Sequence, residues 1–234
     1  MINEGVSTSK LKTTWQKVWR VARWFLLVFV LFYAFGLAMN GYHWWKTPAA
    51  VERIHARTVT MEMVMGENLP PEPSADERDR TVAGVDSNGN GVRDDVELEI
   101  HRRHTDSAKI RAAQLQYAMG FQGQLTAFNG KTLVAALQEK GRGFSCIHNI
   151  HQVDFSSLPD TPSEEWTREE LDYSNRLAKE HDAIVDPLLK EIEELVLNIE
   201  SRRKAHRDTD DFMMSYGSGD KPRGCDIDLQ TLPN

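Results

Sequence analysis

The sequence predicts an all-α protein with a single N-terminal transmembrane helix, a linker and a helical domain. Residues 24–42 are uncharged and largely apolar over about the length that a helix needs to cross a bilayer. Farther along, apolar residues recur at spacings of three and four within 107–128 and 171–199, which is the period of amphipathic helices. Proline residues gather between the apolar stretch and these segments and indicate a linker.

The charge of the chain is unevenly placed. The 234 residues carry a formal net charge of −7, but residues 1–46 hold six Lys or Arg and one acid. Residues 47–234 hold 22 basic and 34 acidic side chains, a net charge of −12. A body this acidic argues against a nucleic-acid partner, because binding phosphates needs a basic surface. It is compatible with a surface that binds cations.

Residues 1–23 form a basic segment, and residues 24–42 form the predicted transmembrane helix that contacts the membrane. Five Lys or Arg precede the apolar stretch, so the positive-inside rule places the N-terminus in the cytoplasm. We expect a single-pass protein of the inner (plasma) membrane of a bacterium, with its body in the periplasm. Aromatic residues flank the stretch at both ends, as in the belts at membrane interfaces: Trp24, Tyr42, Trp44 and Trp45.

A cleaved signal peptide is the alternative for the same stretch. Gly36, Leu37 and Ala38 resemble the small-x-small site of signal peptidases. The long basic segment and the pair Trp44 and Trp45 favour an uncleaved signal anchor instead. Both interpretations deliver the body to the same compartment.

Residues 43–85 form a juxtamembrane segment followed by a proline-rich linker. Residues 47–66 either continue the helix or form a short strand, because apolar residues alternate from Val59 to Met65. Residues 67–80 contain three closely spaced prolines and a run of charges. This composition disfavours helix and predicts a solvated linker.

Residues 86–97 fit the pattern D-x-[DN]-x-[DN]-G-x5-E at every specified position. Gly91 stands at the sixth position, where the chain must turn sharply and a Cβ would be costly. The backbone carbonyl of Val92 is offered at position 7. Calcium takes about six to eight oxygen ligands, so a wrapped loop of this kind predicts a Ca²⁺ site. Side-chain oxygens fall at positions 1, 3, 5, 9 and 12: Asp86, Asn88, Asn90, Asp94 and Glu97.

The loop resembles the calcium loops of EF-hand proteins, and in particular the single loops of dockerins and thrombospondin type 3 repeats. Prolines precede it where an ordinary EF-hand has an entering helix, and Arg93 takes position 8, which is aliphatic in paired EF-hands. The chain contains no second such loop. The resemblance therefore implies a single calcium site and not the opening switch of calmodulin. A polar Asn-Gly turn without metal is the alternative.

The helical domain is expected to span 98–207. Asp94 and Asp95 lie in the first turn of a helix that leaves the loop, with Val96, Ile100 and His104 on one face. A short helix at 132–139 directs Leu133, Ala136 and Leu137 to the core and ends before Gly141 and Gly143. Between them, a helix capped near Thr105 to Ser107 carries an apolar stripe: Ile110, Ala113, Tyr117, Phe121, Leu125 and Phe128.

The last predicted helix begins at a capping box of Thr167 and Glu170 and runs to Lys204. Pro187 is expected to kink or split it. We expect this helix to form an antiparallel bundle with the two helices before it, while a coiled-coil homodimer through 171–199 is the alternative. The tail, 208–234, is expected to be irregular. The stripe of this helix comprises Leu171, Leu177, Ile184, Leu188, Ile192, Leu195 and Ile199.

The two cysteines, Cys146 and Cys225, are expected to form a disulfide outside the cytoplasm, and two free thiols are the alternative. A cysteine nucleophile is not expected, because no oxyanion-forming pattern accompanies either residue. Histidines three residues apart could share helix faces, but zinc needs three or four converging ligands. These pairs are His101 with His104 and His148 with His151.

Together these features predict a non-enzymatic, membrane-anchored calcium-binding protein with a helical domain that binds an unknown protein partner. Calcium is expected to play a structural role by offsetting the repulsion between the loop carboxylates. A calcium-responsive sensor that exposes a helical surface to a partner is the alternative. A hydrolase is not expected, because the sequence offers no coherent catalytic constellation.

Overall fold

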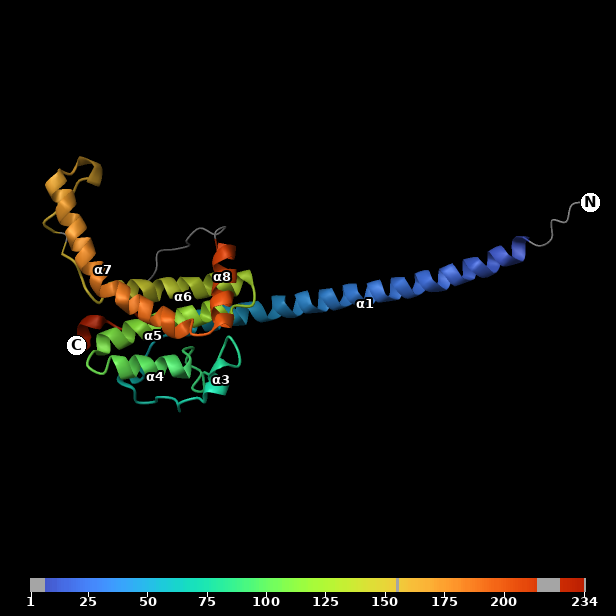
Figure 1. Cartoon of the computed structure of the whole chain (residues 1–234), viewed down its shortest axis with the longest axis horizontal. Helices are drawn as coiled ribbons and strands as arrows, with labels where there is room; N and C mark the ends of the chain where they lie inside the picture. Colours follow the sequence, from blue (N-terminus) through green and yellow to red (C-terminus); the bar gives the residue numbers. More distant parts are fainter. Residues whose placement is uncertain (1–6, 155, 214–223, 234) are drawn as a thin grey trace, which may run out of the picture. The chain divides into compact units, whose positions relative to one another are not determined.

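The computed structural model describes residues 7–154, 156–213 and 224–233. The chain divides after Ala49 into two compact units, which we describe separately. Every regular element among the described residues is helical, so the predicted all-α class is confirmed (Figure 1). The α-helices are α1 (Ser7–Ala56), α2 (Met61–Met65), α3 (Ala75–Asp79), α4 (Asp94–Arg103), α5 (Ala108–Thr126), α6 (Gly130–His148), α7 (Arg168–Val196) and α8 (Glu200–Met213).

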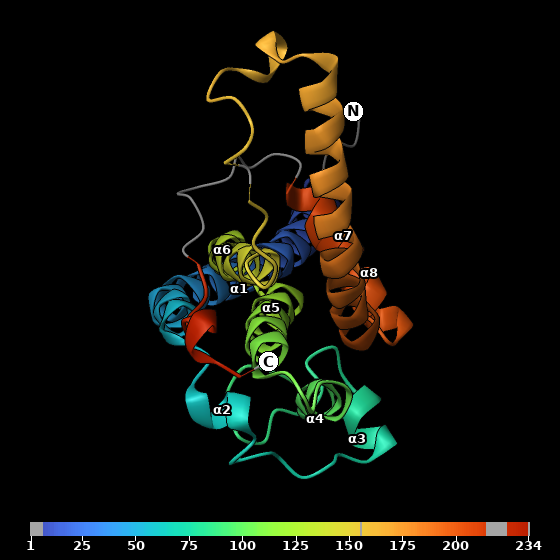
Figure 2. The ribbon, with the colours of Figure 1, turned by 90° about the vertical axis from the view of Figure 1, so that its left-hand side faces the viewer.

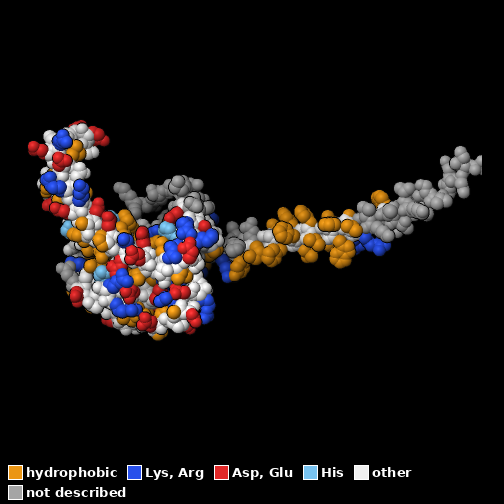
Figure 3. Space-filling view, viewed as in Figure 1, with side chains coloured by type: hydrophobic (Ala, Val, Ile, Leu, Met, Phe, Trp, Pro, Cys, Tyr) orange, Lys and Arg blue, Asp and Glu red, His pale blue; other side chains and the backbone are white. Residues whose placement is uncertain are grey.

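Helix α1 contains the predicted transmembrane stretch. Within it, Trp19–Met39 is 21 residues long with a mean hydropathy of 2.1, which is long and apolar enough to cross a membrane. Figure 3 shows mostly apolar side chains along this stretch, with basic side chains near its N-terminal end. A signal sequence has the same length and composition, so the structure fits both interpretations. Residues 1–6 of the basic segment and the side chain of Trp44 lie outside the described part.

The segment after α1 is helical where alternation suggested a strand. Residues 59–65 alternate apolar side chains, but α2 occupies most of them. The Oγ1 atom of Thr60 accepts the N–H of Met63, and Gly66 ends the helix at a φ of 74°. A side-chain cap at one end and a left-handed glycine at the other stabilise a single helical turn. These local signals outweigh the period-two pattern.

The linker predicted at 67–80 also contains a helix, α3. Ser74 and Glu77 form a capping box in which each side chain accepts a backbone N–H of the other residue. The three prolines all precede Ser74, so they do not interrupt the helix. The predicted solvated linker is therefore limited to the residues before Ser74.

Helix α5 lies at the centre of the second unit. It contacts α2, α4, α6, α7 and α8, which surround it in Figure 2. Ser107 caps it as predicted, and its side chain accepts the N–H of Ile110. Four members of the predicted stripe are buried, but so are residues on the other sides of the helix: the four are Ala113, Tyr117, Phe121 and Leu125. Its predicted last member, Phe128, lies beyond the helix and is 47% exposed.

Polar side chains are buried in α5 because they find partners on other elements. The Nε2 atom of Gln114 donates to the carbonyl of Leu188 at 3.2 Å. The Nε atom of Arg111 donates to the carbonyl of Val64 at 2.8 Å. Such bonds offset the cost of removing polar atoms from water. The sequence of α5 shows its apolar stripe but does not show that these polar side chains are buried as well.

Helix α6 continues through the glycines at which we expected it to end. The sequence predicted a helix at 132–139 followed by a loosened segment at Gly141 and Gly143, but α6 reaches His148. A Cβ atom at Gly143 would lie 2.4 Å from the Cα atom of Tyr117 in α5. This glycine is therefore a point of close helix–helix contact and does not end the helix.

Replacing Gly143 by alanine should lower the free energy of unfolding by about 1–3 kcal/mol, because α5 and α6 must move apart to admit the methyl group. Thermal melting of the full-length protein in detergent measures the change. Gly41→Ala is the matched control, since nothing lies within 4 Å of a Cβ built there. Equal melting of G143A and the wild type would show that the close contact is dispensable.

Two helices replace the single long helix predicted at 167–204. The capping box of Thr167 and Glu170 is confirmed, and Pro187 lies inside α7. The break comes instead at 197–199, between α7 and α8. Helix α8 also includes 208–213, which we expected to be irregular, while 214–223 of the predicted tail lie outside the described residues.

Helix α7 packs on the body of the second unit mainly through its second half. Leu188 and Ile192 are buried there. Leu171, in the first half, is 38% exposed, and Ile184, near the middle of the helix, is 42% exposed, so the predicted stripe is not covered over its whole length. Figure 2 shows this half extending away from α5.

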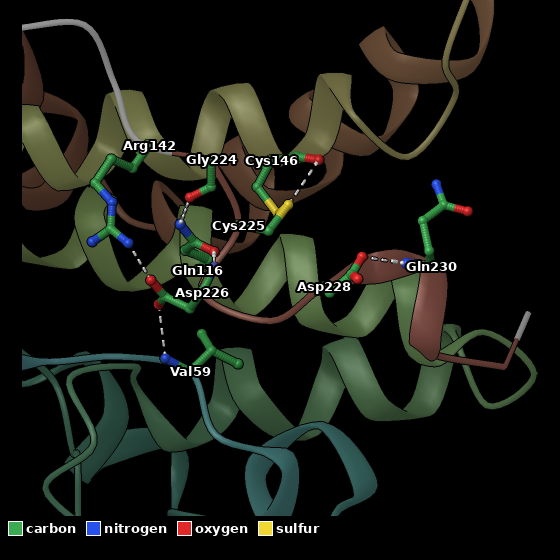
Figure 4. The surroundings of a disulfide bond; sticks show 9 residues. All are labelled: Val59, Gln116, Arg142, Cys146, Gly224, Cys225, Asp226, Asp228 and Gln230. Atoms are coloured by element: carbon green, nitrogen blue, oxygen red, sulfur yellow. Dashed lines mark hydrogen bonds and ion pairs between the residues drawn. A yellow bond between two sulfur atoms is a disulfide. The ribbon is translucent and has the colours of Figure 1, made fainter.

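The end of the chain is fixed to α6 by the predicted disulfide. Cys146 and Cys225 are bonded, with a sulfur–sulfur distance of 2.04 Å (Figure 4). The side chain of Gln116 holds the same segment from α5. Its Nε2 atom donates to the carbonyl of Gly224 at 3.4 Å, and its Oε1 atom accepts the N–H of Asp226 at 2.8 Å. The tail segment 224–233 is thus attached by covalent and polar contacts.

Candidate metal centre

Residues 86–97 form a closed loop that runs directly into α4, as the sequence predicted. The N–H of Gly91 donates to the Oδ2 atom of Asp86 at 3.0 Å and closes the first half of the loop. Gly91 has a φ of 92°, and a Cβ there would lie 2.9 Å from the Cδ atom of Arg57. Its conformation therefore favours glycine at position 6, while the exposed side chain of Arg57 could move to admit a Cβ.

The two asparagines shape the middle of the loop and reach its last ligand. The Oδ1 atom of Asn88 accepts the N–H of Asn90 at 3.2 Å, and the Oδ1 atom of Asn90 accepts the N–H of Val92 at 2.8 Å. Their Nδ2 atoms both donate to the Oε2 atom of Glu97, at 3.1 and 2.9 Å. The structure thus brings positions 3, 5 and 12 into contact.

The carboxylates of the loop are withdrawn from solvent. Asp94 and Glu97 are each 1% exposed. The Oδ1 atom of Asp86 is buried and has no hydrogen-bond partner within the described residues. Burial raises the pKa of Glu97, and the charges of Asp94 and Asp86 raise it further, against the hydrogen bonds from Asn90 and Asn88. The loop therefore holds buried carboxylates that form no ion pair with the part of the chain that the structure describes.

The chemistry of this oxygen set fits a hard divalent cation. No three His, Cys, Asp or Glu side chains of the described residues converge as a metal-ligating group. Three of the six predicted ligands are not side chains of these four types: the side chains of Asn88 and Asn90 and the carbonyl of Val92. The asparagines at present turn their Nδ2 atoms toward Glu97. A cation would satisfy the unpartnered oxygen of Asp86 and the buried charge of Glu97.

Without calcium, the stability of the protein should rise as the pH falls through the titration range of Glu97. Folding raises the pKa of Glu97, so protonation of this side chain stabilises the folded state. This stabilisation is fully present below the unfolded-state pKa and is lost as the pH rises through the folded-state pKa. Melting temperatures measured in EGTA over a pH series test this. The variant Glu97→Gln should show a flatter profile, and an unchanged profile in this variant would contradict the assignment.

Arg93, at loop position 8, connects the loop to the end of α7. Its side chain is fully buried, and its Nε and Nη2 atoms each donate to the carboxylate of Asp95 at 2.7 Å. The guanidinium also donates to the carbonyls of Leu195 and Val196, at 3.0 and 3.1 Å. These carbonyls end a helix and lack partners within it. The sequence marks Arg93 only as a departure from paired EF-hands, and this contact was not predicted.

A second buried arginine, Arg202 of α8, holds the residues that lead into the loop. It donates to the carbonyls of Thr81 and Val82, each at 3.1 Å. Burial and the neighbouring charge of Arg93 lower the pKa of Arg202. A Cβ at Gly84 would lie 2.4 Å from the Cδ atom of Arg93 and 3.0 Å from the Nη2 atom of Arg202. The start of the loop is therefore packed against two buried guanidinium groups.

The histidine pairs noted in the sequence do not act as pairs. The Nε2 atom of His101 lies 2.9 Å from a backbone carbonyl of α2, and that of His104 lies 2.9 Å from the Oε2 atom of Glu191. His148 instead contacts His181 of α7, with its Nδ1 atom 2.9 Å from the Nε2 atom of His181. Sequence reasoning missed His181, because no spacing links it to a residue 33 positions away.

No family model matches this chain, and no curated protein or solved structure matches it either. Any function assigned to the protein therefore depends on the chemistry of the loop and the helices around it.

Proposed function

We propose that the chain is a membrane-anchored calcium-binding protein whose helical body lies outside the cytoplasm, in a bacterial periplasm, and binds a protein partner. The apolar stretch of α1 serves as an uncleaved anchor, with the N-terminus in the cytoplasm. The disulfide between Cys146 and Cys225 supports an oxidising compartment. The body acts as an antiparallel helical bundle, and the chain is not an enzyme.

The buried, uncompensated charge of the loop is the observation that carries this proposal. Among the described residues, one buried oxygen of Asp86 has no partner, and the buried carboxylate of Glu97 accepts hydrogen bonds from two amides. A surface turn without metal has no need of carboxylates at these positions, since burying them costs free energy. A divalent cation supplies the missing positive charge when it binds.

The loop residues would bind the ion through both charged and neutral oxygen ligands. Asp86, Asp94 and Glu97 supply negative charge, while Asn88, Asn90 and the carbonyl of Val92 supply neutral oxygens. Arg93 then connects the closed loop to the end of α7, because its guanidinium donates hydrogen bonds to carbonyls there. In this role calcium fixes the path by which the chain enters α4 and stabilises the body.

Millimolar calcium should raise the melting temperature of the full-length protein in detergent. A single loop with three charged ligands is expected to bind with a Kd of about 10⁻⁴–10⁻³ M. At about ten times the Kd, binding would add roughly 1.4 kcal/mol to the free energy of unfolding. Differential scanning calorimetry with calcium and with EGTA measures the shift.

Variants of the loop separate calcium binding from a general effect of salt. Asp86→Ala and Glu97→Gln should lose the calcium-dependent shift, and Glu97→Gln should be more stable than the wild type in EGTA. Asp76→Asn, at an exposed position of α3, is the matched control and should keep the shift. If titration of the wild type gives no heat and millimolar calcium leaves its melting unchanged, the proposal is wrong.

A calcium-responsive sensor is the second candidate, favoured by the uncovered apolar side chains in the first half and at the middle of α7. Leu171 and Ile184 would belong to a surface that a partner or a second copy covers. A structural site changes the melting temperature and leaves the oligomeric state unchanged. A sensor changes the oligomeric state or the binding of an apolar dye at constant temperature, which light scattering and fluorescence with and without calcium distinguish.

A further inference from the structure

Three histidines gather where α7 meets the end of α6. His148 is the last residue of α6, His151 follows in the next segment, and His181 lies within α7. The Nδ1 atom of His148 and the Nε2 atom of His181 are 2.9 Å apart. The ring centroids of His151 and His181 are 6.1 Å apart. Two elements distant in sequence therefore place three imidazoles in one region.

The contact between His148 and His181 leaves two buried ring atoms unsatisfied. The Nε2 atom of His148 and the Nδ1 atom of His181 are buried and have no hydrogen-bond partner in the described part of the chain. A neutral imidazole carries one N–H and one acceptor nitrogen. Whichever ring donates across the contact, one of the two outer atoms is then an N–H without an acceptor and the other is an acceptor without a donor. A metal bound at the two inner nitrogens would place an N–H on both outer atoms, so the inference depends on the closeness of the inner nitrogens and not on this cost.

The surroundings favour a cation and give it access. The negative charges of Asp182 and Asp186 act on the His148 ring and attract a cation. His151 lines a cavity of about 340 Å³ between α7 and the segment after α6.

We propose that His148, His151 and His181 bind a transition-metal ion, with Zn²⁺ as the probe, across the junction of α6 and α7. The ion takes the place of the proton between His148 and His181, and that proton moves to the bare outer nitrogen of the ring that donated it. With Zn–N bonds of about 2.0–2.1 Å in a tetrahedral site, the two nitrogens need to move apart only from 2.9 Å to roughly 3.3 Å. His151 has to turn toward the pair, since no three ligating side chains yet converge among the described residues. Water from the cavity fills the fourth position.

This site differs from the calcium loop in its ligand chemistry. Imidazole nitrogens select zinc and similar ions, whereas the oxygens of 86–97 select a hard cation such as calcium. The two sites also lie on different elements, so their metals should bind independently. A zinc ion bound by His148 and His181 would fix α7 to α6 at the point where α7 begins to extend from the body.

Calorimetric titration of the full-length protein in detergent with Zn²⁺, in millimolar calcium, tests the site. We expect one zinc per chain. His151→Gln and His181→Gln should each weaken binding by at least the roughly 10–100-fold that loss of an outer-shell partner costs. His55→Gln, at a 41% exposed histidine paired with Glu139, is the matched control and should bind like the wild type. Glu97→Gln should also keep zinc binding.

Two results would overturn the proposal: no zinc binding by the wild type, or binding that survives unchanged in both His151→Gln and His181→Gln. Circular dichroism of the metal-free variants checks that they fold. His151 is only partly buried, so His151→Gln should fold even if a change at the His148–His181 contact does not. Co²⁺ gives a second measurement, because the visible absorption of a tetrahedral nitrogen site should appear in the wild type and be lost in His151→Gln.

Discussion

Replacement of Arg93 by alanine should lower the free energy of unfolding of the second unit by about 3–5 kcal/mol. The guanidinium is fully buried and donates to the carboxylate of Asp95 and to the carbonyls of Leu195 and Val196. Its removal leaves a cavity, a carboxylate that is only 17% exposed, and two helix-terminal carbonyls without partners. Urea denaturation of the full-length protein in detergent, followed by circular dichroism, measures the loss.

Two further substitutions identify the source of this effect. Arg93→Met keeps much of the volume but makes no hydrogen bonds, so it should lie between the wild type and R93A. Arg102→Ala removes an arginine whose side chain is 56% exposed and should cost less than about 1 kcal/mol. If R93A is no less stable than R102A, the bonds from the loop to α7 contribute nothing measurable.

R93A also tests whether calcium binding by the loop is coupled to the contact with α7. Arg93 occupies position 8 of 86–97, so its loss should free the end of the loop from the carbonyls of α7. Calcium should then stabilise R93A less than it stabilises the wild type. An equal calcium-dependent shift in both proteins would show that Arg93 supports the fold without linking it to the metal.

Features that are encoded within a few residues could be predicted from the sequence. The spacing of Asp86, Asn88, Asn90 and Glu97 identified the loop, and α4 begins within it as expected. The capping box of Thr167 and Glu170 located the start of α7 in the same way. In each case the partners lie within about a dozen residues, so the pattern of residue types carries the information.

Features that depend on distant partners could not be predicted. Glycine is typical of helix ends, but Gly143 lies against the backbone of α5 and is a point of helix packing. Arginine is usually exposed to solvent, but Arg93 donates to acceptors in α7 that are 102 and 103 positions away along the chain. Gln114 would interrupt an apolar stripe, yet it is buried because the carbonyl of Leu188 accepts its N–H. A single sequence specifies such contacts only through the completed fold.

Removing the disulfide should lower the free energy of unfolding by about 4–5 kcal/mol in the chain-entropy model, because Cys146 and Cys225 are 79 positions apart. Without this bond the unfolded chain gains the freedom of a long loop. The double variant Cys146→Ser and Cys225→Ser, compared with the oxidised wild type by urea denaturation, measures the difference. Reduction of the wild type with a thiol should reproduce most of it.

The loss should reach beyond the tail, because Asp226 ties it to the segment that follows α1. One carboxylate oxygen of Asp226 accepts the N–H of Val59 at 2.9 Å, and the other pairs with Arg142 of α6 (Figure 4). Once Cys225 is free, these polar bonds, those of Gln116 and the buried side chains of Leu229 and Leu232 still hold the end of the chain, but no covalent bond does. Hydrogen exchange at the amide of Val59 should therefore accelerate in the double serine variant. If it does not, the noncovalent contacts hold the tail, and the disulfide acts only on the unfolded chain.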